Sequence, residues 1–307
     1  MRGYDLEINK QLFEIYRGIF GFNYVTNIND STTSAKHEYT VRAAYLENKL
    51  DLFNEHLMLN FGARMDDYSN FGTQVNPSFS LLYQFNDKLK FTGLISRSFR
   101  APTFNDLYWP DTGWERGNPN LKPEKGLTKE LGFEAQVSKY LTTGITYYQN
   151  DYKQLINWVP DNSGVWTPTN ISKAKIYGIE FMNKVKLSET LGINLDYTFL
   201  IAKDKDTHKY LIYQPKHKID FAVSYKDLNG FILELKGQFT DKRYYNAGNT
   251  VKVKQFFILG LNASKKFKSV ITIFSSINNM LNRKYEVMKD YPMPGFSFTG
   301  GLKAEFN

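Results

Sequence analysis

The side chains that most often perform catalysis or bind metals are few in this chain. There are four histidines, His37, His56, His208 and His217. No two of them have the i, i+4 spacing of a helical zinc site, and no H-E-x-x-H motif occurs. The sequence also has neither a G-x-S-x-G motif nor a Walker A loop. We therefore expect no enzyme activity, no catalytic residues, no metal site and no cofactor.

One predicted loop region brings histidines and carboxylates close together in the sequence. His208 and His217 lie near Asp204 and Asp206. A His/Asp pair can act in general acid–base catalysis when the geometry is right. Solvated loop residues give the same composition, and that is the interpretation we favour. A catalytic pair at this loop is the minor alternative.

The cysteine count and the charge exclude further classes of protein. With no cysteine in 307 residues, disulfides, thiol catalysis and cysteine-ligated zinc are excluded. The net charge of +8 is spread as single charges between other residues, without a dense Lys/Arg cluster. Nucleic-acid binding proteins usually gather their cations on one face or one helix. We therefore expect no nucleic-acid partner.

The elements that must position any site show a period of two. Phe231, Leu233 and Leu235 alternate with Ile232, Glu234 and Lys236. Side chains on a strand point to opposite faces, so each such segment has one apolar face and one polar or small face. Aromatic residues make up 16% of the chain although its mean hydropathy is −0.46, so apolar residues are spread by alternation. About 15 segments of this kind are recognisable.

Two kinds of connection join the predicted strands, and they alternate from about residue 50 onward. Short polar turns lie near 86–88, 138–139, 188–189, 227–229 and 265–268. Longer loops are predicted near 99–127, 158–171, 203–213, 243–253 and 280–294. Alternating short turns and long loops are typical of outer-membrane barrels, in which the long loops are external.

These patterns predict an all-β fold, a transmembrane antiparallel up-and-down β-barrel that occupies residues 1–307. Aromatic residues near predicted strand ends, such as Tyr147, Tyr148 and Trp158, suit the girdles of a membrane barrel. The last predicted strand places Phe296 and Phe306 on one apolar face. A soluble β-sandwich also alternates, but its apolar stripes would then form large exposed patches. No run of about 18 apolar residues predicts a membrane helix.

Four passages carry a resemblance to a known family. They are S-R-S-F-R-A-P-T-F-N-D-L-Y at 96–108, G-N-P-N-L-K-P-E at 117–124, N-I-S-K-A-K-I-Y-G-I-E at 170–180 and I-N-N-M-L-N-R-K-Y at 277–285. In order and spacing they resemble the TonB-dependent receptors, and within them the vitamin B12 transporters. The resemblance covers roughly the last two-thirds of the chain.

The resemblance implies a larger protein. Barrels of this family have about 22 strands around an N-terminal plug, whereas about 15 strands are recognisable here. We expect the plug, the segment that binds TonB and about seven strands to be missing. The calcium-binding loops of the vitamin B12 transporters would lie in that missing part. The first residues contain no apolar signal region, so we expect this chain to be a part of its gene product.

The resemblance also suggests ligand contacts. Tyr291 stands where vitamin B12 transporters have a ligand-contacting tyrosine before the closing strand, and Tyr213 stands near an arginine contact of that family. The aromatic loop residues Tyr108, Trp109 and Trp114 have flat rings that suit stacking on a corrin, a haem or a sugar. The alternative is that these three rings stabilise their loop or lie at the membrane interface.

The functional hypothesis is TonB-dependent transport of a scarce bulky nutrient across a bacterial outer membrane. A corrinoid such as cobalamin is the first cargo, and a ferric siderophore or haem is the alternative. The expected partners are outer-membrane lipid, TonB through the missing N-terminal segment, and the cargo itself. A surface lipoprotein that covers the external loops stays an open alternative. From other classes, a passive porin and a soluble binding protein are the competing hypotheses.

Overall fold

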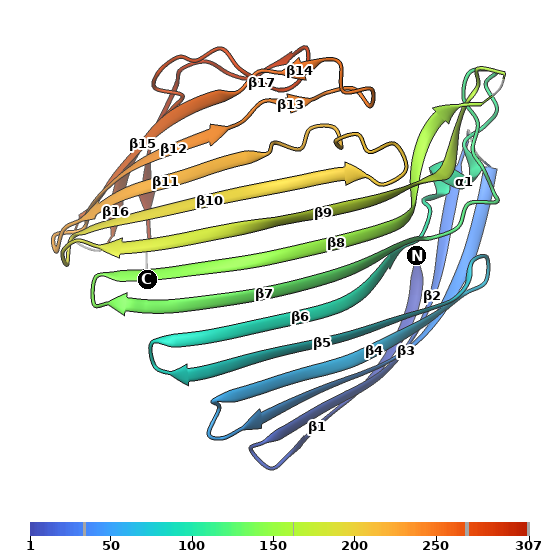
Figure 1. Ribbon diagram of the computed structural model, residues 1–307, viewed down its shortest axis with the longest axis horizontal. Helices are drawn as coiled ribbons and strands as arrows, with labels where there is room; N and C mark the ends of the chain where they lie inside the picture. Colours follow the sequence, from blue (N-terminus) through green and yellow to red (C-terminus); the bar gives the residue numbers. More distant parts are fainter. Residues whose placement is uncertain (33–34, 162, 268–269, 306–307) are drawn as a thin grey trace. The chain divides into compact units, whose positions relative to one another are not determined.

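The computed structural model describes residues 1–32, 35–161, 163–267 and 270–305, with only the backbone of 171 and 172 (Figure 1). The strands of the first part are β1 (Arg2–Leu12), β2 (Tyr16–Ser31), β3 (Ala35–Leu52), β4 (Leu57–Tyr68), β5 (Gly72–Asn86), β6 (Leu89–Arg100), β7 (Glu124–Ser138), β8 (Leu141–Pro160), β9 (Trp166–Lys186) and β10 (Leu191–Asp204). They are followed by β11 (His217–Lys226), β12 (Phe231–Thr240), β13 (Arg243–Tyr244), β14 (Lys252–Val253), β15 (Phe256–Phe267), β16 (Ile271–Asn278), β17 (Glu286–Met288), β18 (Tyr291–Pro292) and β19 (Ser297–Ala304). One short helix, α1 (Phe104–Tyr108), follows β6.

Fifteen strands of the described residues form one antiparallel sheet in chain order, from β1 through β12 to β15, β16 and β19. The pairs β13–β14 and β17–β18 are small separate sheets. The expectation of an all-β, up-and-down barrel with about 15 strands is therefore confirmed. The strand order is open, and β1 and β19 each have one partner among the described residues.

The chain divides into two compact units, and the division cuts across the middle of the long strands. Unit 1 comprises residues 1–131, 148–176 and 204–207, and unit 2 comprises 132–147, 177–203 and 208–307. Both units contain parts of β7, β8 and β9. Each unit is described by itself below.

In unit 1 the strand register aligns apolar side chains into stripes across one face. Phe61 pairs with Phe79, and Phe79 pairs in turn with Ile95. All three side chains are exposed. Because a barrel strand turns its apolar side chains to lipid, we call this the outward face.

The opposite face of unit 1 is polar and tied by hydrogen bonds. The Tyr45 hydroxyl donates to Glu7 over 3.0 Å, and the Asn23 amide donates to Asp5 over 3.4 Å. The Arg64 guanidinium lies 5.5 Å from the centre of the Tyr45 ring. This inward face has the side chains of a wet lumen.

Unit 2 repeats the two faces. On its outward face Val223 pairs with Leu235, and Leu235 pairs with Leu261. On its inward face the Gln238 amide donates to Asp220 over 3.0 Å, and Ser276 donates to Asn262 over 2.7 Å. The alternation in the sequence is thus an alternation between two environments in both units.

The last strand, β19, keeps its apolar side chains exposed on one face. Phe298 pairs with Ile277, and Leu302 pairs with Ile273. Phe306, which the sequence places at the end of this face, lies outside the described residues.

Two ends of the strands differ in their connections. Short turns join β3 to β4, β5 to β6, β7 to β8, β9 to β10 and β11 to β12. At the other end, residues 101–123, 161–165, 205–216, 241–255 and 279–296 connect the strands of the main sheet, and we call it the long-loop end. Residues 53–56 form one of the short turns, with consecutive positive φ angles.

No helix in the described part of the chain combines the length and the apolar character needed to cross a membrane.

Candidate functional site

The first candidate surface is built on the loop 101–123, which begins with a capped helix. The Asp106 N–H donates to the Thr103 hydroxyl oxygen over 3.1 Å, and the Thr103 N–H donates to the Asp106 carboxylate over 2.9 Å. This reciprocal pair is a capping box. The same carboxylate accepts a hydrogen bond from the indole N–H of Trp158 over 3.1 Å. Buried Asp106 therefore ties the helix to β8.

The G-N-P motif closes this loop against the helix. A Cβ atom on Gly117 would lie 2.5 Å from the Trp109 nitrogen and 2.7 Å from the Leu107 carbonyl, so only glycine fits. The Asn118 N–H donates to the Asp106 carbonyl over 2.8 Å. The Asn118 side chain donates to the Pro168 carbonyl over 3.0 Å, which links the loop to β9.

The end of the same motif anchors the start of β7. Glu124 accepts two hydrogen bonds from Arg100, over 2.8 and 2.6 Å. It also accepts one from the Ile156 N–H over 2.8 Å. A bidentate arginine–carboxylate pair fixes geometry as well as charge, so Glu124 holds β6, β7 and β8 together.

The asparagine of the third motif performs the same task for β9. The Asn170 side chain donates to the carbonyls of Lys122 and Gln154 over 2.7 and 2.8 Å, and its oxygen accepts from the Lys122 N–H over 2.8 Å. The first three motifs therefore position the loop rather than form a binding surface by themselves.

The anchored loop leaves a recess of about 430 Å³ between itself and the tips of β8 and β9. We call it the tryptophan recess; its lining residues are Thr103, Asn105, Asp106, Trp109, Glu115, Trp158 and Trp166. Three of the four tryptophans of the chain line it. Flat aromatic walls with a few polar groups suit a planar or ring-shaped ligand.

The three aromatic residues predicted for this loop have different environments. Tyr108 is half-buried and stacks on His37, with 3.7 Å between ring centres and an interplanar angle of 3°. Trp109 ends α1 and lines the tryptophan recess. Trp114 is 79% exposed, and its carbonyl accepts from the Trp166 N–H over 2.8 Å. The structure thus brings Trp109 to a recess and uses Tyr108 in packing.

Trp158 and Trp166 were not among the ligand residues predicted from the sequence. Trp158 lies near the end of β8, and Trp166 is the first residue of β9. The loop predicted at 158–171 is therefore shorter in the structure, because β8 extends to Pro160 and β9 begins at Trp166. A signal was present, because all four tryptophans of the chain lie between positions 109 and 166.

The second candidate surface lies in unit 2, where the other two predicted residues are found. Tyr213 has a φ of +58°, a conformation that non-glycine residues rarely adopt, and its N–H donates to the Tyr244 carbonyl over 2.7 Å. Tyr291 begins β18 and is 69% exposed. Tyr213 is therefore held by its backbone, whereas the Tyr291 ring is exposed.

A buried arginine joins the loops of this surface. Arg243 is 4% exposed and donates to the carbonyls of Glu286 and Val287, each over 2.7 Å. Burial lowers the pKa of Arg243 from its ordinary value, and the electrostatic effect of Tyr213 opposes that shift. Its second terminal nitrogen has no hydrogen-bond partner within the described residues. Sequence patterns gave no sign of this clamp, because the two loops it joins are distant in sequence.

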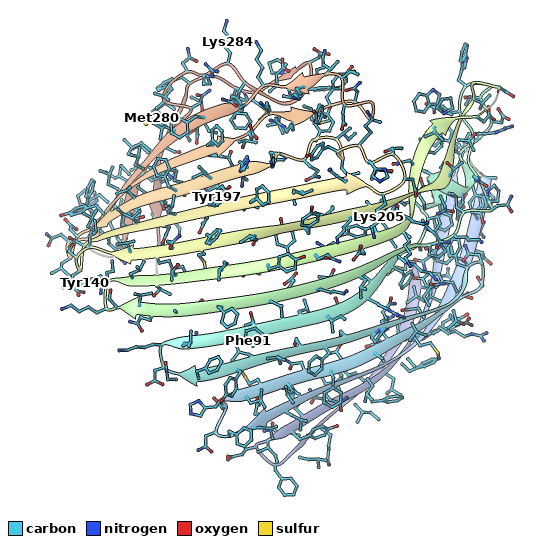
Figure 2. The ribbon with its side chains drawn as sticks, viewed as in Figure 1. Phe91, Tyr140, Tyr197, Lys205, Met280 and Lys284 are labelled. Carbon is cyan, nitrogen blue, oxygen red and sulfur yellow. The ribbon has the colours of Figure 1, made fainter. Side chains whose placement is uncertain are left out.

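Beside the clamp is a cavity of about 700 Å³ that is rich in cations. We call it the basic loop pocket; its charged lining residues are Lys252, Lys254, Arg283, Lys284, Glu286, Lys289 and Asp290. Figure 2 shows Lys284 pointing away from the strands of unit 2. Five cations face two carboxylates, so the pocket favours an anionic ligand.

The fourth motif shapes the floor of this surface. The Asn279 side chain donates to the carbonyls of Arg283 and Pro294 over 2.9 and 3.1 Å. The Asn282 side chain accepts from the Phe296 N–H over 3.0 Å, and a Cβ atom on Gly295 would lie 2.5 Å from that same asparagine oxygen. The motif therefore sets the path of the chain into β19.

Of the residues in the minor catalytic alternative, His217 and Asp204 have structural partners. His217 shares a hydrogen bond of 2.8 Å with the Tyr197 hydroxyl. Asp204 accepts from the Thr207 hydroxyl and N–H over 3.0 and 2.7 Å. In the part of the chain that the structure describes, no three His, Asp or Glu side chains are grouped to hold a metal ion.

In each unit the sheet has an apolar outward face and a polar inward face, with a loop surface beside its strands, which is the arrangement of a receptor-type β-barrel. The family described as TonB dependent receptor-like, beta-barrel matches residues 3–280. The chain therefore belongs to this family. Its members are outer-membrane transporters and receptors rather than enzymes.

Curated relatives come from two groups within the family. The vitamin B12 transporter BtuB of Photobacterium profundum is 32% identical over 74% of this chain and 37% of its own length. The ferric enterobactin receptor PirA of Pseudomonas aeruginosa is 26% identical over 82% of this chain and 38% of its own length. The chain thus spans less than half the length of these relatives.

Solved structures show the same fold. The ferric enterobactin receptor of P. aeruginosa superposes with a TM-score of 0.85 at 19% identity, over 99% of this chain and 53% of that one. The siderophore receptor PirA of Acinetobacter baumannii gives a TM-score of 0.81 at 20% identity, over 99% of this chain and 54% of that one.

Proposed function

We propose that the intact protein takes up a scarce, bulky nutrient across the outer membrane in a TonB-dependent manner, and that a corrinoid is its cargo. The observation that carries the proposal is the tryptophan recess, presented by a family barrel whose curated relatives include a vitamin B12 transporter. In this proposal the long loops face the cell exterior, and TonB acts through a segment outside this chain.

A planar macrocycle suits the tryptophan recess chemically. Trp109, Trp158 and Trp166 offer apolar ring faces, while Glu115 and Asn105 supply polar groups at the same recess. Aromatic stacking contributes about 0.5–1.5 kcal/mol for each ring pair beyond the burial of surface. Two or three such contacts favour a flat ligand over a compact one.

A second cargo class is supported by the basic loop pocket. Ferric chelates of catecholate siderophores are anionic, and five cations line this pocket against two carboxylates. One relative is a ferric enterobactin receptor, in agreement with such a cargo. An iron chelate is therefore the alternative, and a surface lipoprotein that closes over the long loops is compatible with either cargo.

Calorimetry on the full-length protein in detergent tests the two cargoes. We expect cyanocobalamin to bind with nanomolar affinity, about −12 kcal/mol, and Trp109→Ala with Trp166→Ala to weaken it. Tyr291→Ala tests the exposed ring predicted from the family, and Phe298→Ala, on an exposed outward strand face, is the matched control.

Other outcomes would change either the identity of the cargo or the class of protein. Binding of a ferric catecholate in place of cyanocobalamin, lost with Lys252→Gln and Lys254→Gln, would establish the iron-chelate alternative. Steady ion conductance of the full-length protein in a planar bilayer would instead support a passive porin.

A further inference from the structure

We propose that the outward face of unit 1, at its long-loop end, binds the phosphate of an anionic membrane lipid. A pocket of about 700 Å³ lies there, and neither candidate cargo surface includes it. The charged residues that line it are Arg97, Lys125, Asp151, Lys153 and Lys205. We call it the outward cation pocket.

The strand alternation places these cations on the lipid side. Arg97 stands two residues after exposed Ile95 on β6, and on β7 Lys125 shares the parity of exposed Leu131. Thr128 has the opposite parity on β7 and so lies on the inward face, where it donates to Asn150 of β8 over 2.7 Å. Side chains on a strand alternate between two faces.

On β8 the same reasoning assigns the remaining strand residues to the outward face. Asn150 points inward, so Asp151 and Lys153 belong to the opposite face. The Lys205 ammonium is 2.7 Å from the Asp151 carboxylate, which also accepts from the Gln149 amide over 2.6 Å. One carboxylate thus neutralises one of the four cations.

The other cations have no protein counter-ion. Arg97, Lys125 and Lys153 are exposed and form no ion pair with any residue that the structure describes. Lys175 adds a further positive charge near Asp151. Surplus cations on a lipid-facing surface are costly within hydrocarbon, so these side chains belong at the height of the headgroups.

The residues beside these cations show that the pocket lies at the height of the headgroups. Val75 lines the pocket and is 54% exposed on the apolar stripe of β5, while Thr73 and Asn76 beside it are polar. The pocket therefore lies where the apolar face ends and polar loops begin. A phosphate-bearing lipid inserts its acyl chains along the stripe and its headgroup among the cations.

The positions of the cations also suit a phosphate. Lys205 is anchored twice, through the ion pair with Asp151 and through its own N–H, which donates to the Lys173 carbonyl over 2.7 Å. An arginine and two lysines converge on the same pocket from three strands. Arginine offers paired donors and lysine a compact charge, which is the combination that phosphate oxygens accept. Basic pockets on membrane proteins bind anionic headgroups in this way.

Native mass spectrometry of the full-length protein in detergent tests the proposal, with diphosphoryl lipid A as the probe. We expect one lipid to bind to the wild type. The triple variant Arg97→Gln, Lys125→Gln, Lys153→Gln should bind at least about tenfold more weakly, since each cation near a headgroup contributes about 1 kcal/mol.

Three controls keep the test sharp. Lys88→Gln, Lys139→Gln and Lys226→Gln remove the same charge from exposed lysines at short turns and should leave binding unchanged. Lys125→Arg with Lys153→Arg should retain binding, which also shows that these positions tolerate substitution. Cargo affinity should be the same in all variants, because no lining residue of the pocket lines either cargo surface.

Two probes identify the source of the phosphate. Dephosphorylated lipid A should not bind to the cation pocket, and equal binding of it would overturn the proposal because acyl chains alone would then suffice. Inorganic phosphate in large excess should compete only weakly. If it binds as well as the lipid and responds to the same triple variant, the pocket is a free-anion site and the lipid assignment is wrong.

Discussion

The loops beside the tryptophan recess and those beside the basic loop pocket are held in place in different ways. In unit 1 the loop is fixed by many short contacts, among them the capping box of Thr103 and Asp106. In unit 2 a buried cation, Arg243, joins two loops by reaching two carbonyls. The first arrangement leaves rings exposed to a ligand, whereas the second leaves charges exposed.

The difference explains why motifs of the family do not reveal cargo. Gly117, Asn118, Glu124 and Asn170 all contact the backbone or each other's loops. None of these anchors lines the tryptophan recess or the basic loop pocket. A chain can therefore keep the motifs and exchange the surface.

Filling the close approach of Gly117 to the backbone of α1 should have the largest effect. Gly117→Ala places a Cβ 2.5 Å from a backbone nitrogen, which cannot move without breaking the loop. We expect a local destabilisation of about 1–3 kcal/mol and rapid hydrogen exchange in 101–123. The basic loop pocket should be unaffected.

Gly248→Ala is the matched control, since its added Cβ meets only ordinary contacts at 3.6 and 3.9 Å. Equal exchange rates for wild type and Gly117→Ala would show that the loop has a second way to close.

The buried clamp of unit 2, Arg243, should be the next most sensitive position. Arg243→Met leaves the carbonyls of Glu286 and Val287 without their donor, at a cost of about 1–3 kcal/mol. Hydrogen exchange in 286–293 should accelerate, while the tryptophan recess keeps its protection. Arg283→Met, at an exposed side chain, is the control. Unchanged exchange in 286–293 would mean that the loops are held by packing instead.

The salt dependence of cargo affinity should show which of the two surfaces binds the cargo. If the ligand stacks in the tryptophan recess, Trp109→Ala lowers its affinity by about tenfold, and added salt has little effect. If the ligand is held in the basic loop pocket, Lys254→Gln has the larger effect and salt weakens binding by screening. Fluorescence titration at low and high salt measures both responses.

The smallest expected effect is a pH dependence of the turn that follows β8. The hydrogen bond from the Ser163 N–H, together with the Val165 N–H and Arg116, holds the pKa of Asp161 below its usual value of 3.8. A lowered pKa stabilises the fold above the ordinary pKa and loses that contribution as pH falls through the lowered value.

Proteolysis of the 161–165 turn should therefore be constant from neutral pH down to about 4 and should increase only below it. Asp161→Asn should remove the pH dependence and give the same cleavage at all pH values. An increase that begins near neutral pH would assign the change to another group.

Sequence reasoning predicted the sheet because its signal is local. The alternation of Leu233 and Leu235 with Glu234 and Lys236 is set by the geometry of one strand, and the register in unit 2 preserves it. Strand number and chain-order pairing follow from the same signal and from short turns.

The binding surfaces were harder to predict because their residues meet across the chain. Tyr108 was a reasonable ligand candidate by type, but it stacks on His37, 71 positions earlier. Trp166 joins the recess through a hydrogen bond with Trp114, and Arg243 reaches Val287 from 44 positions away. Such contacts depend on the pairing of distant strands, which composition does not encode.

Strands β8 and β9 are 20 and 21 residues long, about twice the 9–11 residues that a tilted strand needs to cross a bilayer. With the long loops outside, the surplus ten residues of each strand, at about 3.3 Å per residue, lift the tryptophan recess on the order of 20 Å above the lipid. Under the proposed function, the cargo is then bound above the membrane surface rather than at the level of the lipid headgroups. The distance between recess and lipid is therefore set by the length of these two strands, so shortening the hairpin would move the recess toward the membrane without changing its lining residues.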